Sequence, residues 1–291
     1  MAFPTETVYG LGANALDPSA VAKIYIAKGR PAESPLIVHV DSVQMARGLV
    51  TEWPERAEQL ARRFWPGPLT LVLPKQSQVP DCLTAGLQTV GIRVPKNPIA
   101  LALIREAGVP IAAPSANRFS ELSPTTAAHV RESLGDRVAM VLDGGRAKVG
   151  IESTVLSLAG PRATLLRPGM LTKAEIEGVI GSVEVYQSSV ADAHPAPGMH
   201  RRHYSPRTLL VLVEDGQVPA TGRGVYLWIM NSALAARAIR MPDNPRAYAA
   251  VLYATLHRAD AQNWDWIAVE KPPLGPEWAA IHDRLERAAA R

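Results

Sequence analysis

Short apolar runs bounded by turn residues dominate the first two thirds of the chain. Each run has the length and residue content of a β-strand, and seven stand out: 35–40, 69–74, 90–95, 109–114, 139–144, 153–158 and 163–168. The 25 prolines and 21 glycines divide the sequence into many short elements. This punctuation favours a sheet-containing fold over a helical bundle.

Helical patterns lie between these runs. One has apolar residues at i, i+3, i+4 and i+7 and must end at the prolines that follow it: Ala57, Leu60, Ala61 and Phe64. Asp17 before Pro18 is a helix cap followed by a first-turn proline, so we expect a helix over about 18–28. Thr172 and Glu175 have the spacing of a capping box that opens another helix.

The composition changes after residue 187. Residues 188–206 are too rich in Pro, Ser and small side chains for either period and indicate a linker. Apolar periodicity then returns in three predicted strands and two predicted helices: 208–214, 224–230, 265–270, 246–261 and a last helix with Trp278, Ile281 and Leu285 on one face. We therefore expect an α/β domain at 1–187, a linker at 188–206 and a small α/β domain at 207–291.

Overall composition places the chain among globular proteins. It has 291 residues, of which 47% are hydrophobic and 20% charged. No run approaches the roughly 18 apolar residues of a membrane helix, and the start lacks a basic and apolar leader, so we expect a soluble cytoplasmic protein with no membrane contact. Cys82 is alone, which excludes an intramolecular disulfide. The net charge of +4 suits anionic ligands but is too small to indicate nucleic-acid binding.

The usual nucleotide and hydrolase signatures are missing or misplaced. There is no GxxxxGK[ST] loop and no GxSxG elbow. Residues 10–15, GLGANA, fit GxGxxA, but the helix cap at Asp17 comes several residues too late for a dinucleotide fingerprint. A turn after a first strand is the better interpretation.

Several basic residues could bind an anion. Lys28 and Arg30 flank a glycine at the end of a predicted helix, where they could complement the helix dipole or clamp a phosphate; spacing alone favours the dipole. Arg93 lies in an apolar strand whose neighbours supply no carboxylate, so its counter-ion must come from elsewhere in the fold or from a substrate. His39, also in a strand, is more often a core histidine than a ligand.

Polar side chains follow two predicted strands. Four crowd the end of the first one and must face either solvent or a ligand, which the sequence leaves open: Thr5, Glu6, Thr7 and Tyr9. Ser115 and Asn117 lie in the loop after 109–114, where open α/β sheets place ligands, although turn chemistry explains them equally well.

The linker is basic and rich in histidine. It holds His194, His200 and His203, but no acid lies between Asp192 and Glu214, and nearby arginines would repel a metal ion. A basic segment of this kind suits an anion, and it could close as a lid over phosphates.

Taken together, eight ordered motifs resemble the YrdC-like family, the threonylcarbamoyl-AMP synthases. They are FPTETVYGLGANA, KGRPAESPLIVHV, FWPGPLTLVL, VGIRVP, PSANRFSELSPTT, ESTVL, LLRPGML and PGMHRRHYSP, and they cover about residues 2–206. The tail resembles the two-domain form of that family. The resemblance implies a twisted mixed sheet with flanking helices and a smaller Rossmann-like C-terminal domain.

The resemblance also implies a reaction. The family joins L-threonine, bicarbonate and ATP into threonylcarbamoyl-AMP and releases pyrophosphate, and a tRNA threonylcarbamoyl transferase then uses the product at adenosine 37. A carbamate oxygen attacks the α-phosphorus, so such an enzyme must hold two substrates in line and needs no protein nucleophile. Magnesium would accompany the ATP, and no protein metal ligands are expected.

Site residues follow from the same resemblance. The catalytic group would surround the phosphates: Lys28, Arg30, Ser115 and Asn117. Further nucleotide contacts would be Ser34, Thr89, Ser123 and Arg167, with Arg202, His203 and Tyr204 in the lid. Threonine would contact Thr7, His39, Arg93, Ala113 and Ser153, and its carboxylate would supply the counter-ion that Arg93 lacks.

Two other functions stay open at this point. An RNA-binding module would use the basic balance, reflected in a pI near 9.3, and would bind RNA weakly without regard to threonine. A nicotinamide oxidoreductase based on GLGANA is the remaining alternative.

Overall fold

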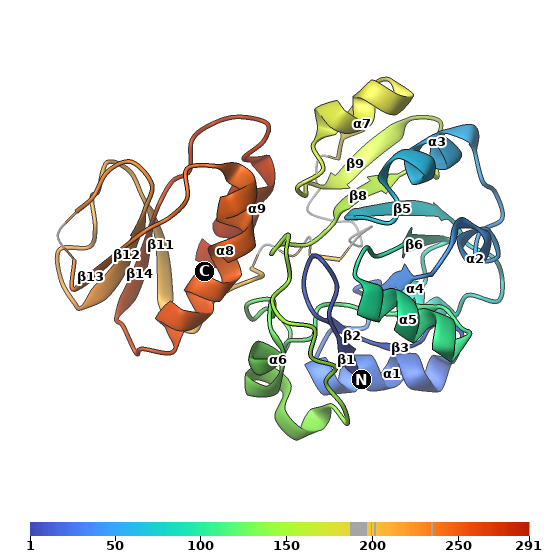
Figure 1. Ribbon diagram of the computed structural model, residues 1–291, viewed down its shortest axis with the longest axis horizontal. Helices are drawn as coiled ribbons and strands as arrows, with labels where there is room; N and C mark the ends of the chain where they lie inside the picture. Colours follow the sequence, from blue (N-terminus) through green and yellow to red (C-terminus); the bar gives the residue numbers. More distant parts are fainter. Residues whose placement is uncertain (187–196, 199, 201, 234, 291) are drawn as a thin grey trace.

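The computed structural model describes residues 1–186, 197–198, 200, 202–233 and 235–290. Two β-sheets lie at opposite ends of an elongated molecule, with helices α8 (Pro245–Asp260) and α9 (Ala279–Ala289) between them (Figure 1). We call the part that holds the larger sheet the N-terminal domain and the part from residue 207 onward the C-terminal domain.

The larger sheet is mixed, and its order joins strands that are distant in sequence. Over the described residues it has eight strands in the order β10-β9-β8-β5-β6-β4-β7-β3. Their bounds are β3 (Ala13–Asn14), β4 (Ile37–His39), β5 (Leu69–Pro74), β6 (Thr89–Arg93), β7 (Ile111–Ala112), β8 (Thr154–Ser157), β9 (Ala163–Arg167) and β10 (Val183–Val185). The strand β5 is antiparallel to β6 and parallel to β8. The expected α/β class with a mixed sheet is therefore confirmed.

Local sequence signals set the helices of this domain. They are α1 (Pro18–Lys28), α2 (Val43–Arg47), α3 (Glu55–Phe64), α4 (Asp81–Thr84), α5 (Pro98–Ala107), α6 (Ala127–Leu134) and α7 (Lys173–Ile180), with a 3-10 turn η1 (Gly135–Arg137). The Asp17 carboxylate caps α1, and Gly29 ends it with φ +61°, so the helix predicted at 18–28 is confirmed. The capping box of Thr172 and Glu175 opens α7 as predicted.

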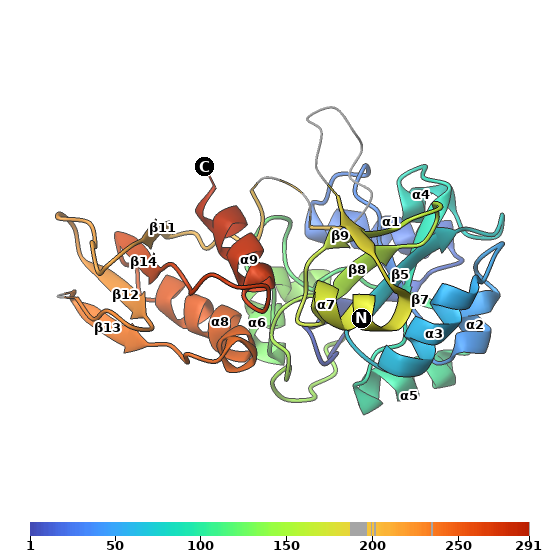
Figure 2. The same ribbon diagram turned by 90° about the horizontal axis from the view of Figure 1, so that it is seen from above.

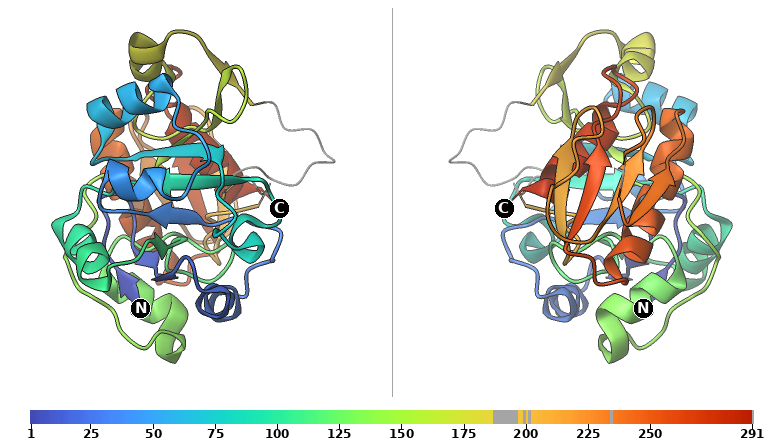
Figure 3. Two further views of the ribbon diagram at one scale, coloured as in Figure 1. Left: turned by 90° about the vertical axis from the view of Figure 1, so that its right-hand side faces the viewer. Right: turned by 90° about the vertical axis from the view of Figure 1, so that its left-hand side faces the viewer.

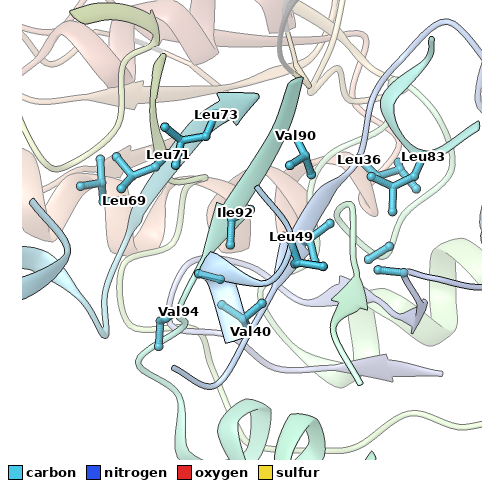
Figure 4. Close-up of a cluster of buried hydrophobic side chains, with 14 of the residues drawn as sticks. Leu36, Val40, Leu49, Leu69, Leu71, Leu73, Leu83, Val90, Ile92 and Val94 are labelled. Atoms are coloured by element: carbon cyan, nitrogen blue, oxygen red, sulfur yellow. The ribbon is translucent and has the colours of Figure 1, made fainter. Parts of the chain in front are cut away.

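The core of the N-terminal domain fixes the central strands. Leu69, Leu71 and Leu73 project from one face of β5 and are fully buried beside Val90 and Ile92 of β6 (Figure 4). Burying each such side chain contributes about 1.5–3 kcal/mol. Because the opposite face of β5 is covered too, the strand reads as a nearly continuous apolar run, and it gives the loops at its ends a rigid support.

One predicted strand is wrong and several strands were missed. Residues 139–144 form no strand: Val141 makes a single bridge to Ala2, because β1 (Ala2–Phe3) is short and pairs with β2 (Gly10–Leu11). The missed strands include β3, β10 and β13 (Arg237–Arg240), and two arginines hide the period of β13. The strand β13 lies at the sheet edge, where only one side needs a hydrogen-bonded neighbour.

The C-terminal domain is a parallel sheet backed by two helices. Its strands are β11 (Leu209–Val213), β12 (Gly224–Trp228), β13 and β14 (Trp266–Glu270), in the order β11-β14-β12-β13. Both helices lie on the sheet face that looks toward the N-terminal domain (Figure 2), and the other face points away from it (Figure 3, right). Over the described part of the chain, none of the helices has the length and apolarity to cross a membrane.

The two domains contact each other closely along α8. Gly150, at φ +82°, lies so near this helix that a side chain there would come within 2.3 Å of the Ala249 carbonyl oxygen. The His257 Nε2 of α8 lies 3.1 Å from the Ser123 carbonyl oxygen, and its ring stacks on His129 of α6 at 3.8 Å between centroids. The C-terminal domain is therefore packed against the loops that follow the strands of the larger sheet.

Candidate active site

A cavity opens where the ends of β4, β6, β8 and β9 meet the loop after β7. Residues from distant parts of the N-terminal domain line it, and a described part of the linker closes one side. The lining residues are Thr5, Thr7, Val8, Gly10, Arg30, Ile37, His39, Arg93, Ala113, Pro114, Ser115, Glu152, Ser153, Arg167, Pro197, Gly198, His203 and Tyr204. Ten of the predicted site residues are thus brought to one hollow.

Two arginines in this cavity join no ion pair within the described residues. Arg30 donates from Nε and Nη2 to the carbonyl oxygens of Ser34 and Pro35, at 3.4 and 3.2 Å. Arg167 donates to the Ser153 carbonyl oxygen at 3.0 Å and to the Pro197 carbonyl oxygen at 2.7 Å. Both are buried, and within the described chain neither guanidinium joins an ion pair. Burial lowers the pKa of Arg30 to about 10, so it stays charged at neutral pH.

Lys28 supports this cationic wall from behind. Its Nζ donates to the carbonyl oxygens of Ser115, at 2.6 Å, and Asn117, so it ties the end of α1 to the loop after β7. Burial, and then the charge of Arg30, lower the pKa of Lys28 well below its ordinary value. The amine does not line the cavity. The structure brings Lys28 to Ser115 and Asn117, as the resemblance implies, through backbone contacts.

Arg93 has its counter-ion within the fold, which is one of the two sources that the sequence left open. Its Nη2 lies 2.7 Å from Oε1 of Glu6, in an ion pair whose N–H direction is not aligned as a hydrogen bond. Nη1 donates to the Thr7 hydroxyl at 2.9 Å, and Nε to the Gly67 carbonyl oxygen at 3.1 Å. A substrate carboxylate is therefore not needed to balance Arg93, because the loop before β2 supplies Glu6.

Neutral polar groups fill the rest of the hollow. Burial, and then the charge of Arg93, lower the pKa of His39 to about 3, so the imidazole is neutral at physiological pH. Its Nδ1 has no partner in the described chain. The Ser153 hydroxyl lies 2.8 Å from that of Thr70, and Thr7 pairs with Thr5 at 2.9 Å. Thr5, Glu6 and Thr7 thus face the interior rather than solvent.

Four predicted site residues lie outside the cavity lining, besides Lys28 and Arg202. Asn117 is buried behind the loop, and its Oδ1 has no partner among described atoms. Ser123 donates its hydroxyl to Oε1 of Glu152 at 2.6 Å. The Ser34 hydroxyl oxygen lies 2.6 Å from Nε2 of His200. Thr89 begins β6, at the opposite end from Arg93.

Described residues of the linker cover one side of the cavity. His203 and Tyr204 are buried in it, with ring centroids 4.1 Å apart. Gly198 lies so close that a side chain there would come within 2.1 Å of the Tyr204 hydroxyl oxygen. Arg202 is exposed and does not line the cavity. The predicted His194 and the segment 188–196 lie outside the described residues.

The covered cavity is small and offers no metal cage. With the described linker residues in place, its accessible volume is about 50 Å³, enough for a few waters. The described residues contain no group of three or more acids, histidines or cysteines that could hold a metal ion. Its lining carboxylate, Glu152, is already bonded to Ser123, Tyr253 and Arg284. These residues do not fit a protein-built magnesium site.

Comparison with known families agrees with this geometry. Residues 1–169 match the family model for Sua5, YciO and YrdC proteins, described as telomere recombination. The chain belongs to the Sua5/YciO/YrdC family. Residues 171–290 match a second model, described as the C-terminal domain of threonylcarbamoyl-AMP synthase, so this member has the two-domain form of the family. The resemblance seen in the sequence is confirmed.

Individual relatives extend the match over the chain. A Pyrococcus abyssi protein called threonylcarbamoyl-AMP synthase is 53% identical over 74% of this chain and 64% of its own length. A Bacillus subtilis protein of that name is 44% identical over 99% of this chain and 89% of its own. The crystal structure of P. abyssi Sua5 complexed with L-threonine superposes with a TM-score of 0.92 at 42% identity, covering 99% and 89% of the two chains. The expected YrdC-like fold with a second small α/β domain is confirmed.

Sequence reasoning missed several residues that build the site. Glu152, Tyr253 and Arg284 form a buried group beside the cavity, and two of them come from the C-terminal domain. A glutamate next to Ser153 gave a weak signal, and Arg284 gave none, because its position on α9 has the apolar period of a core residue. Glycine at position 198 carried no signal without knowledge of Tyr204.

Proposed function

We propose that this chain joins L-threonine, bicarbonate and ATP into threonylcarbamoyl-AMP with release of pyrophosphate. The threonine amine and bicarbonate give a carbamate and water. A carbamate oxygen then attacks the α-phosphorus of ATP, and the bond to the bridging oxygen of pyrophosphate breaks. Bonds balance without a protein nucleophile, so binding, alignment and charge stabilisation are what the residues must provide.

Two arginines that join no ion pair in the described chain carry this proposal. Arg30 and Arg167 are buried cations in one cavity, and such cations are costly unless an anion arrives. A triphosphate would complete them, and their planar donors suit phosphate oxygens. In the same proposal, Ser115 and Asn117 position phosphates beside them, Lys28 holds that loop, and Ser34, Thr89 and Ser123 keep their predicted nucleotide roles. Pyrophosphate would leave from this wall.

Threonine would occupy the opposite side of the hollow. Thr7, His39, Ala113, Ser153 and Arg93 are the residues we propose there, supported by the threonine complex of the P. abyssi relative. Arg93 already has Glu6 as its ion-pair partner, so the substrate carboxylate would be a second anion on this guanidinium. A neutral His39 supplies no negative charge that would stabilise an ammonium group, which favours the unprotonated amine that carboxylation needs.

Covering the cavity would protect the product. Threonylcarbamoyl-AMP is a mixed anhydride, so water in the site would destroy it, and His203 and Tyr204 exclude water when they close the hollow. We propose that this part of the linker moves outward to admit the substrates, closes over them, and opens again to release the product. Ser34 would then exchange its contact with His200 for ATP. Arg202, exposed here, would turn inward when ATP is bound.

Magnesium, the transferase and RNA remain parts of the proposal. Since the residues offer no metal cage, magnesium would enter as the counter-ion of ATP phosphates, and we assign it no protein ligand and no step. The product would pass to a tRNA threonylcarbamoyl transferase in the cytoplasm, with at most weak RNA contact. The functional division we propose is the catalytic domain 1–187, the covering linker 188–206 and the supporting domain 207–291.

The decisive experiment measures pyrophosphate with each substrate omitted in turn. We expect release from ATP only when L-threonine and bicarbonate are both present. L-Serine, which lacks the threonine methyl group, serves as the matched control and should support slower release. Equal release without threonine would refute the proposed reaction, and threonine-independent RNA binding of high affinity would favour the RNA-binding alternative.

A further inference from the structure

A fully buried arginine of the C-terminal domain reaches the cavity wall. Arg284, on α9, has 1% of its surface exposed. Its Nε donates to Oε2 of Glu152 at 2.7 Å, and its Nη2 donates to the Pro168 carbonyl oxygen at 3.0 Å, both in the N-terminal domain. Nη1 donates to Asp283 beside it. All three nitrogens are therefore engaged, which explains why such a cation is tolerated without solvent.

Its partner Glu152 lines the cavity and stays ionised. Burial would raise the pKa of Glu152, but Arg284, Arg167 and hydrogen bonds outweigh that cost and hold the pKa below its ordinary value. The carboxylate accepts from the Ser123 hydroxyl at 2.6 Å and from the Tyr253 hydroxyl at 3.1 Å. Two of its three donors thus belong to the C-terminal domain, and the next residue in the chain is Ser153 of the cavity.

Arg284 also supports the cover. The guanidinium carbon lies 5.2 Å from the ring centroid of Tyr204, within the range of cation–π attraction. Tyr204 adopts φ +60°, a backbone conformation that a bulky residue rarely adopts unless its surroundings hold it. Its ring also packs beside that of Tyr253, with centroids 5.9 Å apart. One arginine therefore contacts the cavity wall and the residue that closes it.

We propose that Arg284 is a positioning residue that holds Glu152 and the ring of Tyr204 in fixed positions relative to each other. The C-terminal domain thereby determines how tightly the cavity closes. The inference rests on the proposed function, because the quantity it controls is ATP and threonine binding. The guanidinium donates to Glu152 and Pro168 while its carbon lies over the ring of Tyr204, a combination that a lysine ammonium cannot reproduce.

Another contact between the domains provides a matched control. Arg246 of α8 pairs with Glu175 of α7 at 3.4 Å, and its side chain is 76% exposed. Neither residue lines the cavity. If Arg284 only stabilised the contact between the two domains, losing its contacts or losing the Arg246–Glu175 pair would change the kinetic constants in the same way. The two effects would differ only in magnitude.

The test compares Arg284→Lys with Arg246→Ala in the full-length protein. We expect Arg284→Lys to raise the KM for ATP about tenfold with kcat changed less than about threefold, because closure over ATP is weakened while the reacting groups stay in place. Arg246→Ala should leave both constants within about twofold. Melting temperatures are measured in parallel. A fall in kcat with unchanged KM values, or equal KM shifts in both variants, overturns the inference.

A second variant decides the matter if Arg284→Lys does not fold. Tyr253→Phe removes one hydroxyl donor to Glu152 and keeps the ring; we expect the threonine KM to rise about threefold, and unchanged KM values overturn the inference. ATP binding by titration calorimetry separates this question from the proposed function. A wild type that binds ATP but releases no pyrophosphate refutes the proposed function. The role of Arg284 is then tested by comparing the ATP Kd of Arg284→Lys with that of the wild type. A wild type that binds no ATP overturns both.

Discussion

Buried arginines on the two sides of the cavity differ in whether they have an ion-pair partner. On one side Arg93 lies 2.7 Å from Glu6. On the other side Arg30 and Arg167 donate to carbonyl oxygens and join no ion pair in the described chain. The balanced side is complete without a ligand. The other side holds the positive charge of Arg30, which an anion from outside can neutralise.

This difference separates structural roles from binding roles among residues of one type. A paired arginine orders the chain around it, and removing one member leaves the other charge buried and alone. An unpaired arginine makes the empty cavity less favourable and the filled cavity more favourable, which increases the affinity for phosphate. The contrast therefore predicts different consequences for substitutions that look alike in sequence.

The largest effect is expected from a substitution that removes the Arg93–Glu6 ion pair. Arg93→Met leaves the buried carboxylate of Glu6 without its cation, and we expect the free energy of unfolding to fall by about 3–5 kcal/mol. Threonine affinity should fall as well. Chemical denaturation checks the first effect, and titration with L-threonine checks the second. Combining Arg93→Met with Glu6→Gln removes the orphaned charge and should recover part of the stability; an unchanged denaturation midpoint in the single variant would contradict the contrast.

A matching change on the unbalanced side should affect activity and spare stability. Arg30→Met removes a buried cation that joins no ion pair in the described chain, so the free energy of unfolding should change by less than about 1 kcal/mol. The kcat/KM for ATP should fall about 10²–10³-fold, as when one donor to a developing negative charge is lost. Steady-state pyrophosphate release at saturating threonine gives this value. A large loss of stability with intact ATP kinetics would reverse the assignment of the two sides.

The smallest of the three effects is a pH dependence from His39. Its pKa is about 3 in the fold and about 6.5 when unfolded, so the unfolded chain binds the extra proton first. The stability that this imparts is complete above pH 6.5 and is lost as the pH falls toward 3. Between pH 7 and 5 it should amount to about 2 kcal/mol. His39→Phe keeps a ring and cannot titrate, so its stability should fall less over this range; parallel curves for the two proteins would exclude the effect.

Local patterns recovered much of the fold because each depends on neighbouring residues. The helix at 18–28 follows from Asp17 and a proline, and the capping box of α7 follows from two side chains three residues apart. The error at 139–144 arose because an apolar run becomes a strand only when a partner of sufficient length lies beside it, and β1 ends at Phe3. Pairing is decided by distant segments, which no local period contains.

The sequence by itself determined the class of fold, the family and most side chains of the cavity, since ordered motifs and apolar periods are written along the chain. Only the tertiary structure decided which charges are balanced. Glu6 pairs with Arg93 although the two are 93 − 6 = 87 residues apart in the sequence. Arg284 bonds Glu152 across 132 residues. Electrostatic pairing acts over a few ångströms in space, and sequence order does not record that distance.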